Sequence, residues 1–280
     1  MTALHLAKDS EKGEWKARDA SNYDLLRTHI PFLGGGRDIY YPKSEDRNVK
    51  YELLQCSRGL ATGGSKNINE LVDNVRNSEM FMRESDMERA EELEEFVPQE
   101  MENLKTVAEM GFRVPRLLDY YKGRGVKFVK GYDVVGLNVE VGKKLGFDVE
   151  IKDFNDHENL DLRSLGDVDL LLSYHVFEHL SRPDIVLKKI YDSLKAGALL
   201  HVEVPIGPYG KGVLPEVHIG HLFSFHDDDM NKLLTSCGFK IIFGRWKTTR
   251  EFIEICSSHV KKYRTRKKVT MTERYIAQKE

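Results

Sequence analysis

The amino-acid sequence predicts an α/β protein built on a doubly wound, mostly parallel sheet of seven strands. Short apolar runs alternate with helical segments from Arg113 onward, which is typical of parallel α/β sheets. Residues 167–205 read as one strand, polar loop, helix and second strand, a βαβ unit with a right-handed crossover. Two β-rich runs, 240–246 and 251–256, are separated by four residues and predict an antiparallel hairpin that closes one edge of the sheet.

The composition supports this fold and limits the classes of molecule that the protein is expected to bind. The chain has 280 residues, 40% of them hydrophobic, which is enough for one large domain with an appendage. Its net charge of -2 gives no general attraction to nucleic acid. The three cysteines lie far apart and form no CxxC pair, which argues against a disulfide framework or a zinc site. No apolar run approaches the roughly 18 residues of a membrane span, so we expect a cytoplasmic protein.

The first 112 residues differ in character from the rest. Glycine-rich breaks predict short elements and loops up to a helix at 68–76. Residues 79–110 are acidic and helical in spacing, with a break at Pro98. We therefore predict a loop-rich and mainly helical N-terminal cap or accessory region over residues 1–112, which could also form a homodimer interface.

The predicted strands of the parallel sheet follow in chain order. They are 114–119, 134–137, 149–151, 169–173 and 199–204. A helix with an apolar stripe lies between Pro183 and Gly197, and another spans 227–236. The sheet domain is thus expected over residues 113–258, and residues 259–280 are expected to form a basic, solvated C-terminal tail.

Ionisable side chains gather where the fourth predicted strand ends. His175, Glu178 and His179 follow residues 169–173 directly. Open α/β sheets bind their ligands at the carboxyl edge of the strands. Two further histidines, His218 and His221, lie in the loop after the fifth strand and should converge on the same edge.

A second candidate site element follows the first predicted strand. Asp119 ends that strand, and Gly123 and Gly125 come shortly after it. Glycines without side chains let the backbone approach a nucleotide-like ligand closely. At the end of the second predicted strand, the Asn138 amide could both donate to and accept from a ribose hydroxyl.

Together these junctions resemble a class I S-adenosylmethionine-dependent methyltransferase with a Rossmann-like fold, similar to the small-molecule and sugar O-methyltransferases. LLDYYKGRG resembles the glycine-rich first motif, usually an Asp followed by three alternating glycines, and GYDVVGLN the second strand with its acidic end. Lys152-Asp153-Phe154 resembles the adenine-contacting turn. DLLLSYHVFEHLSRP and LKAGALLHVEVP resemble the fourth and fifth strands, and HLFSFHDDDMNKLLTSCGFKII the late helix and strand.

The resemblance implies S-adenosylmethionine as the cofactor and a set of residues that bind it. These are Asp119, Tyr121, Gly123, Gly125, Asn138, Asp153, Phe154, Ser173 and His175. In this alignment Tyr121 replaces the first alternating glycine and Asn138 replaces the ribose-binding acid. Because a neutral acceptor forms a hydrogen bond about 1 kcal/mol weaker than a charged one, weaker cofactor binding is expected.

The implied reaction needs a base, because an aliphatic hydroxyl is a poor nucleophile at neutral pH. Histidine suits this role, since its pKa lies near 6.5. We favour His179, then His221, then His218, with Glu178 orienting a histidine or contacting the substrate. No metal is expected, because Asp227 to Asp229 are explained as the first turn of a helix.

The sequence therefore predicts an O-methyltransferase that acts on a hydroxyl of a small molecule, most readily a sugar or glycan, with nucleic acid unlikely as a partner. One alternative is methylation of RNA or of a protein, with the basic tail as an anchor. Another is a non-catalytic interaction module that keeps the fold without the reaction.

Overall fold

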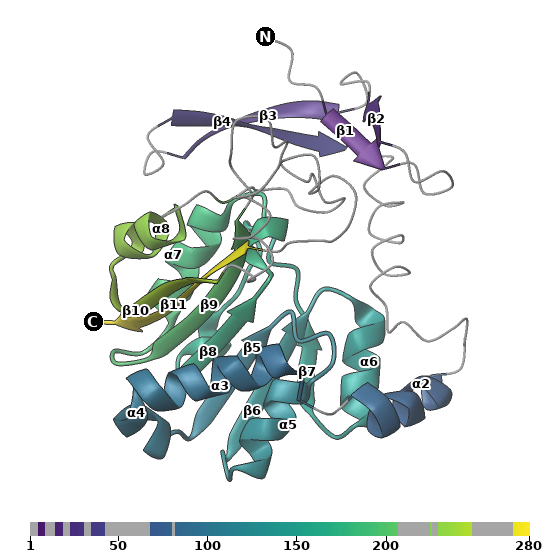
Figure 1. The fold of residues 1–280 in the computed structure, drawn as a ribbon, viewed down its shortest axis with the longest axis vertical. Coiled ribbons are helices and arrows are strands. Elements are labelled where there is room, and N and C mark those ends of the chain that lie inside the picture. Colours follow the sequence, from purple (N-terminus) through teal and green to yellow (C-terminus); the bar gives the residue numbers. More distant parts are fainter. Residues whose placement is uncertain are drawn as a thin grey trace, which may run out of the picture.

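The computed structural model describes residues 68–79, 82–206, 225, 229–247 and 271–280, together with four N-terminal strands (Figure 1). Those strands, β1 (His5–Lys8), β2 (Trp15–Arg18), β3 (Tyr23–Ile30) and β4 (Gly35–Pro42), pair as two antiparallel hairpins, β1 with β2 and β3 with β4. The sequence predicted only short elements and loops there and did not identify the hairpins. Among the described residues, no helix is long and apolar enough to cross a membrane.

A seven-stranded sheet forms the centre of the molecule. Its order is β10-β11-β9-β8-β5-β6-β7. Six of these strands run in the same direction, and β11 alone among the seven runs antiparallel to both of its neighbours, β9 and β10. The bounds are β5 Thr106–Met110, β6 Phe128–Asp133, β7 Asp148–Ile151, β8 Leu170–Tyr174, β9 Leu199–Ile206, β10 Phe239–Lys247 and β11 Met271–Lys279.

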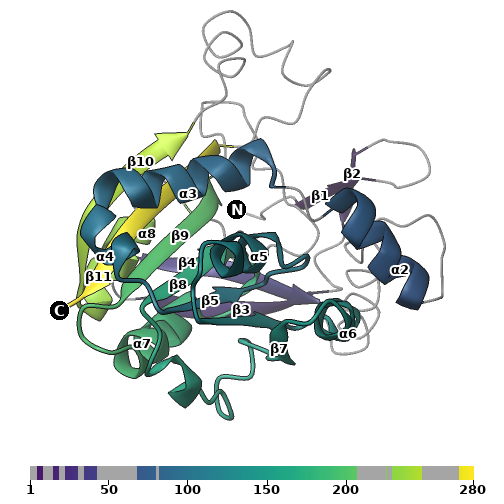
Figure 2. The ribbon, with the colours of Figure 1, turned by 90° about the horizontal axis from the view of Figure 1, so that it is seen from below.

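Helices cover both faces of the sheet (Figures 1 and 2). One face carries α3 (Glu84–Phe96), α5 (Arg116–Gly123) and α6 (Gly136–Lys144), and the other carries α7 (Pro183–Ser193) and α8 (Asp229–Cys237). Two short helices complete the N-terminal side: α2 (Ile68–Asn74), extended by a π-helical turn η3 (Val75–Glu79), and α4 (Pro98–Glu102). The predicted doubly wound α/β fold is therefore confirmed.

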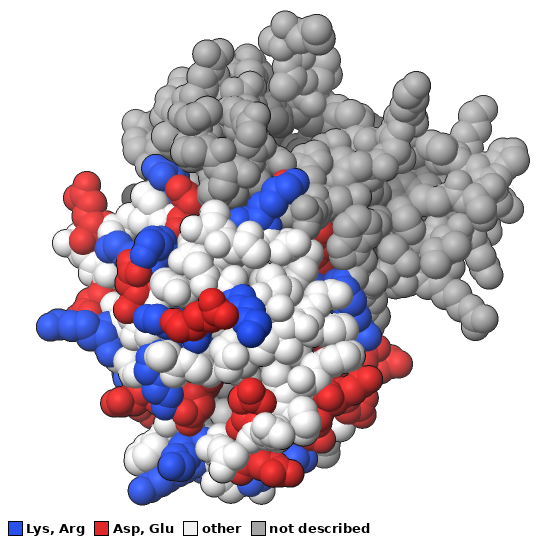
Figure 3. All heavy atoms as spheres, turned by 90° about the vertical axis from the view of Figure 1, so that its left-hand side faces the viewer, with Lys and Arg blue, Asp and Glu red and all other residues white. Residues whose placement is uncertain are grey.

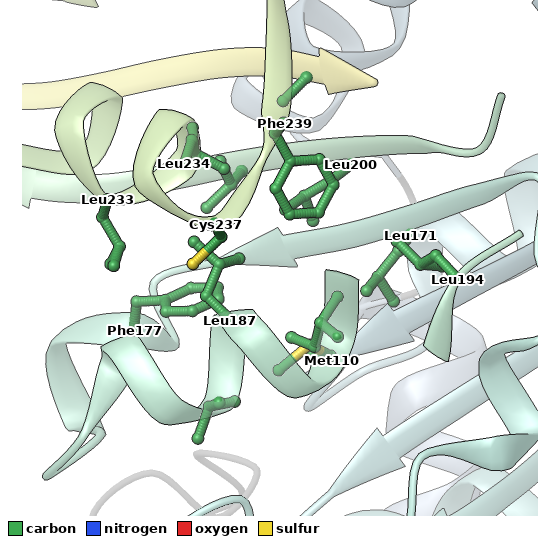
Figure 4. Packing of buried hydrophobic residues seen from close by; sticks show 14 of the residues in the cluster. Met110, Leu171, Phe177, Leu187, Leu194, Leu200, Leu233, Leu234, Cys237 and Phe239 are labelled. Carbon is green, nitrogen blue, oxygen red and sulfur yellow. The ribbon is translucent and has the colours of Figure 1, made fainter. Parts of the chain in front are cut away.

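Alternating side chains of the buried strands supply both core layers. On the face of α7 and α8, Leu171 and Leu200 meet Leu187 and Leu234 in one apolar cluster (Figure 4). The adjacent residues of the same strands, Leu170 and Leu199, point to the opposite face. There they pack in a second cluster with side chains of α3 and α5, namely Leu93, Leu117 and Leu118. A strand that is buried on both faces reads as a continuous apolar run, which is why β8 and β9 could be located from sequence.

Several predicted boundaries are wrong. The first strand of the sheet is β5, not 114–119, most of which belongs to α5. The second strand is β6, which ends at Asp133, and the predicted strand 134–137 is instead a turn that enters α6. Both errors arise because apolar residues on the buried side of a short helix imitate a strand when only a few residues are considered.

The C-terminal end also differs from the prediction. Residues 271–279 form β11, which lies between β9 and β10 inside the sheet, so this part of the predicted tail is not a solvated end. The antiparallel partner of β10 is β11, while the run 251–256 lies outside the described residues. The sheet also begins before residue 113, because β5 precedes that position.

Candidate active site

The turn after β5 has the geometry of a close ligand approach. Glu109 is the next-to-last residue of this interior strand and is only 6% exposed, and its Oε2 has no hydrogen-bond partner among the described residues. Burial raises its pKa to about 8. Gly111 follows with a φ of 68°, and Arg113 with a φ of 49°. An acid, a glycine and a second left-handed residue thus alternate at the carboxyl edge.

The next strand, β6, ends in a buried carboxylate. Asp133 accepts hydrogen bonds from the backbone N–H groups of Arg113 (2.9 Å) and Val135 (2.8 Å) and from the Asn138 amide (3.2 Å). Burial nevertheless raises its pKa above the ordinary value. The turns after β5 and β6 are therefore tied together through one acid, and the Oδ1 atom of Asn138 has no hydrogen-bond partner in the described part of the chain.

An exposed apolar surface lies next to this acid. Ile151, which pairs with Asp133 across the sheet, is 62% exposed, and Val134 and Leu137 are 38% and 37% exposed. Large apolar side chains rarely remain exposed side by side without a ligand or partner. Phe154, after β7, is buried, and its ring packs edge-on against Tyr132.

His175, directly after β8, is held by two carboxylates. Its Nε2 lies 2.9 Å from Glu203 on β9, and its Nδ1 lies 3.3 Å from Glu178. Burial lowers the pKa of this ring, but the hydrogen bonds to Glu178 and Glu203 outweigh it and raise the pKa to about 9. His175 is therefore an imidazolium at neutral pH, with both ring nitrogens directed at carboxylates.

Glu178 also lies near a second histidine. It belongs to the short 3-10 helix η5 (Phe177–His179) and is 1% exposed. Its Oε1 is 3.8 Å from Nε2 of His179, whose side chain is 23% exposed. One buried carboxylate is thus placed between the rings of His175 and His179.

A pocket of about 470 Å³ opens at this edge, between α3, α5 and the ends of β5, β8, β9 and β11. Most of its lining is polar or charged. The lining includes Arg89, Glu109, Arg113, His175, Glu203 and Arg274.

The structure places four of the predicted cofactor residues away from this edge. Asp119 lies exposed in the middle of α5, and Gly123 and Gly125 lie at its end, in the turn that leads into the amino end of β6. Tyr121 is 1% exposed and packs in the core. The glycine-rich first motif is therefore not 117–125, and its place after the first strand is taken by residues 109–115.

With the first motif at residues 109–115, Tyr121 and Asn138 are no longer the positions at which this chain departs from the family pattern. The strand-end acid is Asp133, and Asn138 lies in α6 as its hydrogen-bond donor. The first alternating glycine is Gly111, while Arg113 and Pro115 stand at the next two positions. Sequence reasoning missed Glu109, although an acid two residues before a glycine was visible at the end of an apolar run.

The remaining predicted residues lie closer to the expected places. Ser173 is fully buried in β8, and its Oγ has no hydrogen-bond partner in the described ranges. His175, Glu178 and His179 follow that strand, and Asp153 and Phe154 follow β7. His218 and His221 lie outside the described residues. No group of three or more potential metal ligands occurs among the residues that the structure describes.

Comparison with known proteins agrees with this geometry. Residues 108–202 match the model of a methyltransferase domain. The fold is similar to that of a Haemonchus contortus phosphoethanolamine N-methyltransferase 2 solved with S-adenosyl-L-methionine, at 12% identity and a TM-score of 0.54, over 87% of this chain and 62% of that chain. A SAM-dependent methyltransferase from Archaeoglobus fulgidus is 18% identical, with a TM-score of 0.49, over 75% of this chain and 99% of that one. No curated protein matches the sequence.

The fold is thus the Rossmann-like fold of class I methyltransferases, with β11 inserted antiparallel beside β9. The match of residues 108–202 to a methyltransferase domain agrees with a reaction that uses S-adenosylmethionine. The residues present fit this cofactor. Buried polar atoms of Glu109, Asn138 and Ser173 that no described residue satisfies lie at the carboxyl edge, and the apolar surface around Ile151 offers a place for a purine ring.

Proposed function

We propose that this enzyme transfers a methyl group to a hydroxyl of a polar acceptor, a sugar or glycan residue, with His179 as the base. The observation that carries the proposal is the buried Glu178 carboxylate beside His179 at the edge where the cofactor is expected. A carboxylate that orients a histidine is the recurring arrangement for withdrawing a proton from a hydroxyl.

When bound, S-adenosylmethionine supplies an electrophilic methyl on its sulfonium. The chain has to align the acceptor with that methyl, exclude water and take up the proton of the hydroxyl. We propose that Asp133 holds the ribose and that Glu109 and the turn at Gly111 face the methionine portion. We also retain Asp153, Phe154 and Ser173 as residues proposed to contact the cofactor.

His175 is a poor candidate for the base. Both of its ring nitrogens are directed at carboxylates, and its pKa of about 9 keeps it protonated at neutral pH. The His179 Nε2 lies 3.8 Å from the Glu178 Oε1, farther than either ring nitrogen of His175 lies from its carboxylate. The loop residues His221 and His218 remain the second and third candidates.

The polar character of the pocket supports a polar acceptor. Charged side chains from α3, β5, β9 and β11 reach into the same space, and apolar side chains are in the minority. Hydroxyl-rich ligands are bound by such planar, hydrogen-bonding groups, whereas a flat aromatic or lipid acceptor would leave them without partners.

A screen with methyl-labelled S-adenosylmethionine against sugars, glycans, nucleotide sugars, RNA and protein tests this proposal. We expect label in a carbohydrate, and a loss of about 10²–10⁴-fold in rate for His179→Asn. The control is His157→Asn, since His157 hydrogen-bonds Ser181 rather than Glu178 and should leave the rate unchanged. Label only in RNA or protein, or equal rates in both variants, would contradict the proposal.

Methylation of RNA remains the alternative to test. On the face that carries the β10 edge, basic and acidic side chains are interspersed and form no field of one sign (Figure 3). An RNA substrate should show a steep loss of affinity with added salt, because bound phosphates release counterions. A carbohydrate acceptor should show little salt dependence. The predicted homodimer is checked by sedimentation in the same preparation.

A further inference from the structure

His175 has a backbone conformation that needs outside support. Its φ of 58° lies in the left-handed region, which residues with a side chain seldom adopt. Such a conformation persists only where the surroundings fix it, and it is enriched at functional sites. His175 directly follows β8 and lines the pocket, so the support for it belongs to the active site.

Glu203 of β9 supplies that support at two points. The backbone N–H of His175 donates to the Glu203 carbonyl at 2.9 Å, and the His175 ring Nε2 donates to the Glu203 carboxylate at 2.9 Å. One residue therefore fixes both the main chain and the ring of His175.

The Glu203 carboxylate is itself fixed by two arginines from distant parts of the chain. Arg274 on β11 donates its Nε to Oε2 at 2.6 Å, and Arg89 on α3 donates Nη2 to Oε1 at 2.9 Å. Arg274 is 1% exposed and also donates to Glu92 of α3 at 2.7 Å. Because its guanidinium donates to two carboxylates at once, the side chain of Arg274 is held in a single position.

These contacts form a continuous series. From Arg274 they lead through Glu203 to His175, from the His175 Nδ1 to Glu178, and from Glu178 to His179. The last strand of the chain is thereby connected to the base that we propose, through side chains of β9 and the segment after β8.

We propose that Arg274 is a positioning residue of the methyl-transfer site, which acts through Glu203 to hold His175, and with it Glu178, in place. The last strand then completes the acceptor end of the pocket. The inference rests on the proposed function for the role of His179, but the support of His175 does not depend on which acceptor is used.

NMR titration of His175 in the full chain, saturated with S-adenosylhomocysteine, separates positioning from simple electrostatics. The ring is assigned with a His175→Asn variant. In Arg274→Met, loss of a positive charge beside Glu203 would by itself raise the pKa of His175 or leave it unchanged. If Arg274 holds Glu203 in place, the carboxylate moves away from the ring and the pKa of His175 falls, by about one unit. The charged groups that contact the ring or line the same pocket are Glu178, Glu203, Arg89, Arg274, Glu109, Arg113, Arg83, Asp86 and Arg116.

The matched control is Arg245→Met, because Arg245 on β10 also pairs with Glu92 but not with Glu203. We expect an unchanged His175 titration in that variant. An unchanged or raised pKa of His175 in Arg274→Met, or the same fall in Arg245→Met, would overturn the inference. Should Arg274→Met fail to fold, Arg274→Gln takes its place with the same readouts.

Turnover provides the second readout once an acceptor is known. We expect kcat to fall about 10- to 100-fold in Arg274→Met, with the Kd for S-adenosylhomocysteine within about threefold of the original, because a small displacement of a catalytic group is costly. Arg274→Lys should recover part of the rate by restoring a cation. A loss confined to cofactor affinity would overturn the inference. Failure of the carbohydrate screen alone leaves the NMR result standing, so the two proposals fail separately.

Discussion

Replacing Asp133 by asparagine tests where the cofactor lies. Asp133 ends β6, and its carboxylate is already fixed by the backbone of Arg113 and Val135 and by Asn138. A pre-oriented carboxylate at this edge can accept hydrogen bonds from the two neighbouring hydroxyls of a ribose. Each such bond to a charged acceptor is stronger than a neutral one by about 1 kcal/mol.

Two weakened bonds amount to about 2 kcal/mol, so Asp133→Asn should bind S-adenosylhomocysteine about 30-fold more weakly. Isothermal calorimetry with that compound measures the change directly. A thermal melt in parallel reports the effect on folding, since an asparagine at 133 also loses one acceptor for its backbone donors.

Asp119→Asn is the matched control. Asp119 was the sequence-based candidate for the acid of the first motif, but it is exposed on α5. Its affinity for S-adenosylhomocysteine should be unchanged. The reasoning is refuted if Asp133→Asn binds within about threefold of the original protein, or if Asp119→Asn is weakened as much.

Three further predictions concern folding and its pH dependence. The pKa of Glu109 is raised by burial from its ordinary value to about 8, so the folded state binds its proton more tightly than the unfolded chain, and stability falls as pH rises between about 4.5 and 8. Glu109→Gln should remove this loss, so the Tm and the free energy of unfolding should increase more at pH 8.5 than at pH 5, the free-energy gains differing by at most roughly 5 kcal/mol; an equal change at both pH values would contradict the burial argument. Gly111→Ala should lower the free energy of unfolding by about 1–3 kcal/mol in a urea titration, because φ is 68° and the new Cβ would lie 2.7 Å from Val176 Cγ2. An unchanged urea midpoint would argue against this turn. Deleting residues 271–280 should abolish cooperative melting in circular dichroism, because β11 pairs with both β9 and β10, whereas a folded truncated protein would show that β11 is dispensable.

The last of these predictions changes how the basic tail can be studied. Removal of residues 261–280 would report on anchoring only if those residues were a solvated end. Because β11 occupies 271–279, that deletion would remove a strand of the sheet as well. Charge-neutralising substitutions within 261–268 are the suitable test of a polyanion contact.

The parts of the fold that were predicted correctly from sequence are those where the apolar pattern was long and was bounded by residues that start or stop a helix. The unit from β8 through α7 to β9 was found because two strands that begin with apolar runs enclose a helix that begins at Pro183 and ends before Gly197. Pro98 correctly marked a break, since it opens α4. In contrast, β5 was absorbed into a predicted helix because its five residues, TVAEM, include helix-forming Ala, Glu and Met.

That single error moved the candidate site. A first strand at 114–119 puts Asp119 and the following glycines in the place of the cofactor-binding turn. Only strand pairing corrects this, because β5 pairs in parallel with both β6 and β8, and α5 does not. In the site that we propose, Glu109 and Gly111 therefore take the acid and glycine roles, and Asp133 takes that of the strand-end acid.

By itself, the sequence determined the class of fold and the cluster of ionisable side chains after β8, because both depend on local periodicity and on residue types at strand ends. The tertiary structure alone decided which acids face the pocket and which cations hold them. Arg89, Glu203 and Arg274 come from three elements separated by up to 185 positions, and no local pattern links them. They meet because β11 enters the sheet beside β9 while α3 crosses its face, and burial then makes each charge depend on the others.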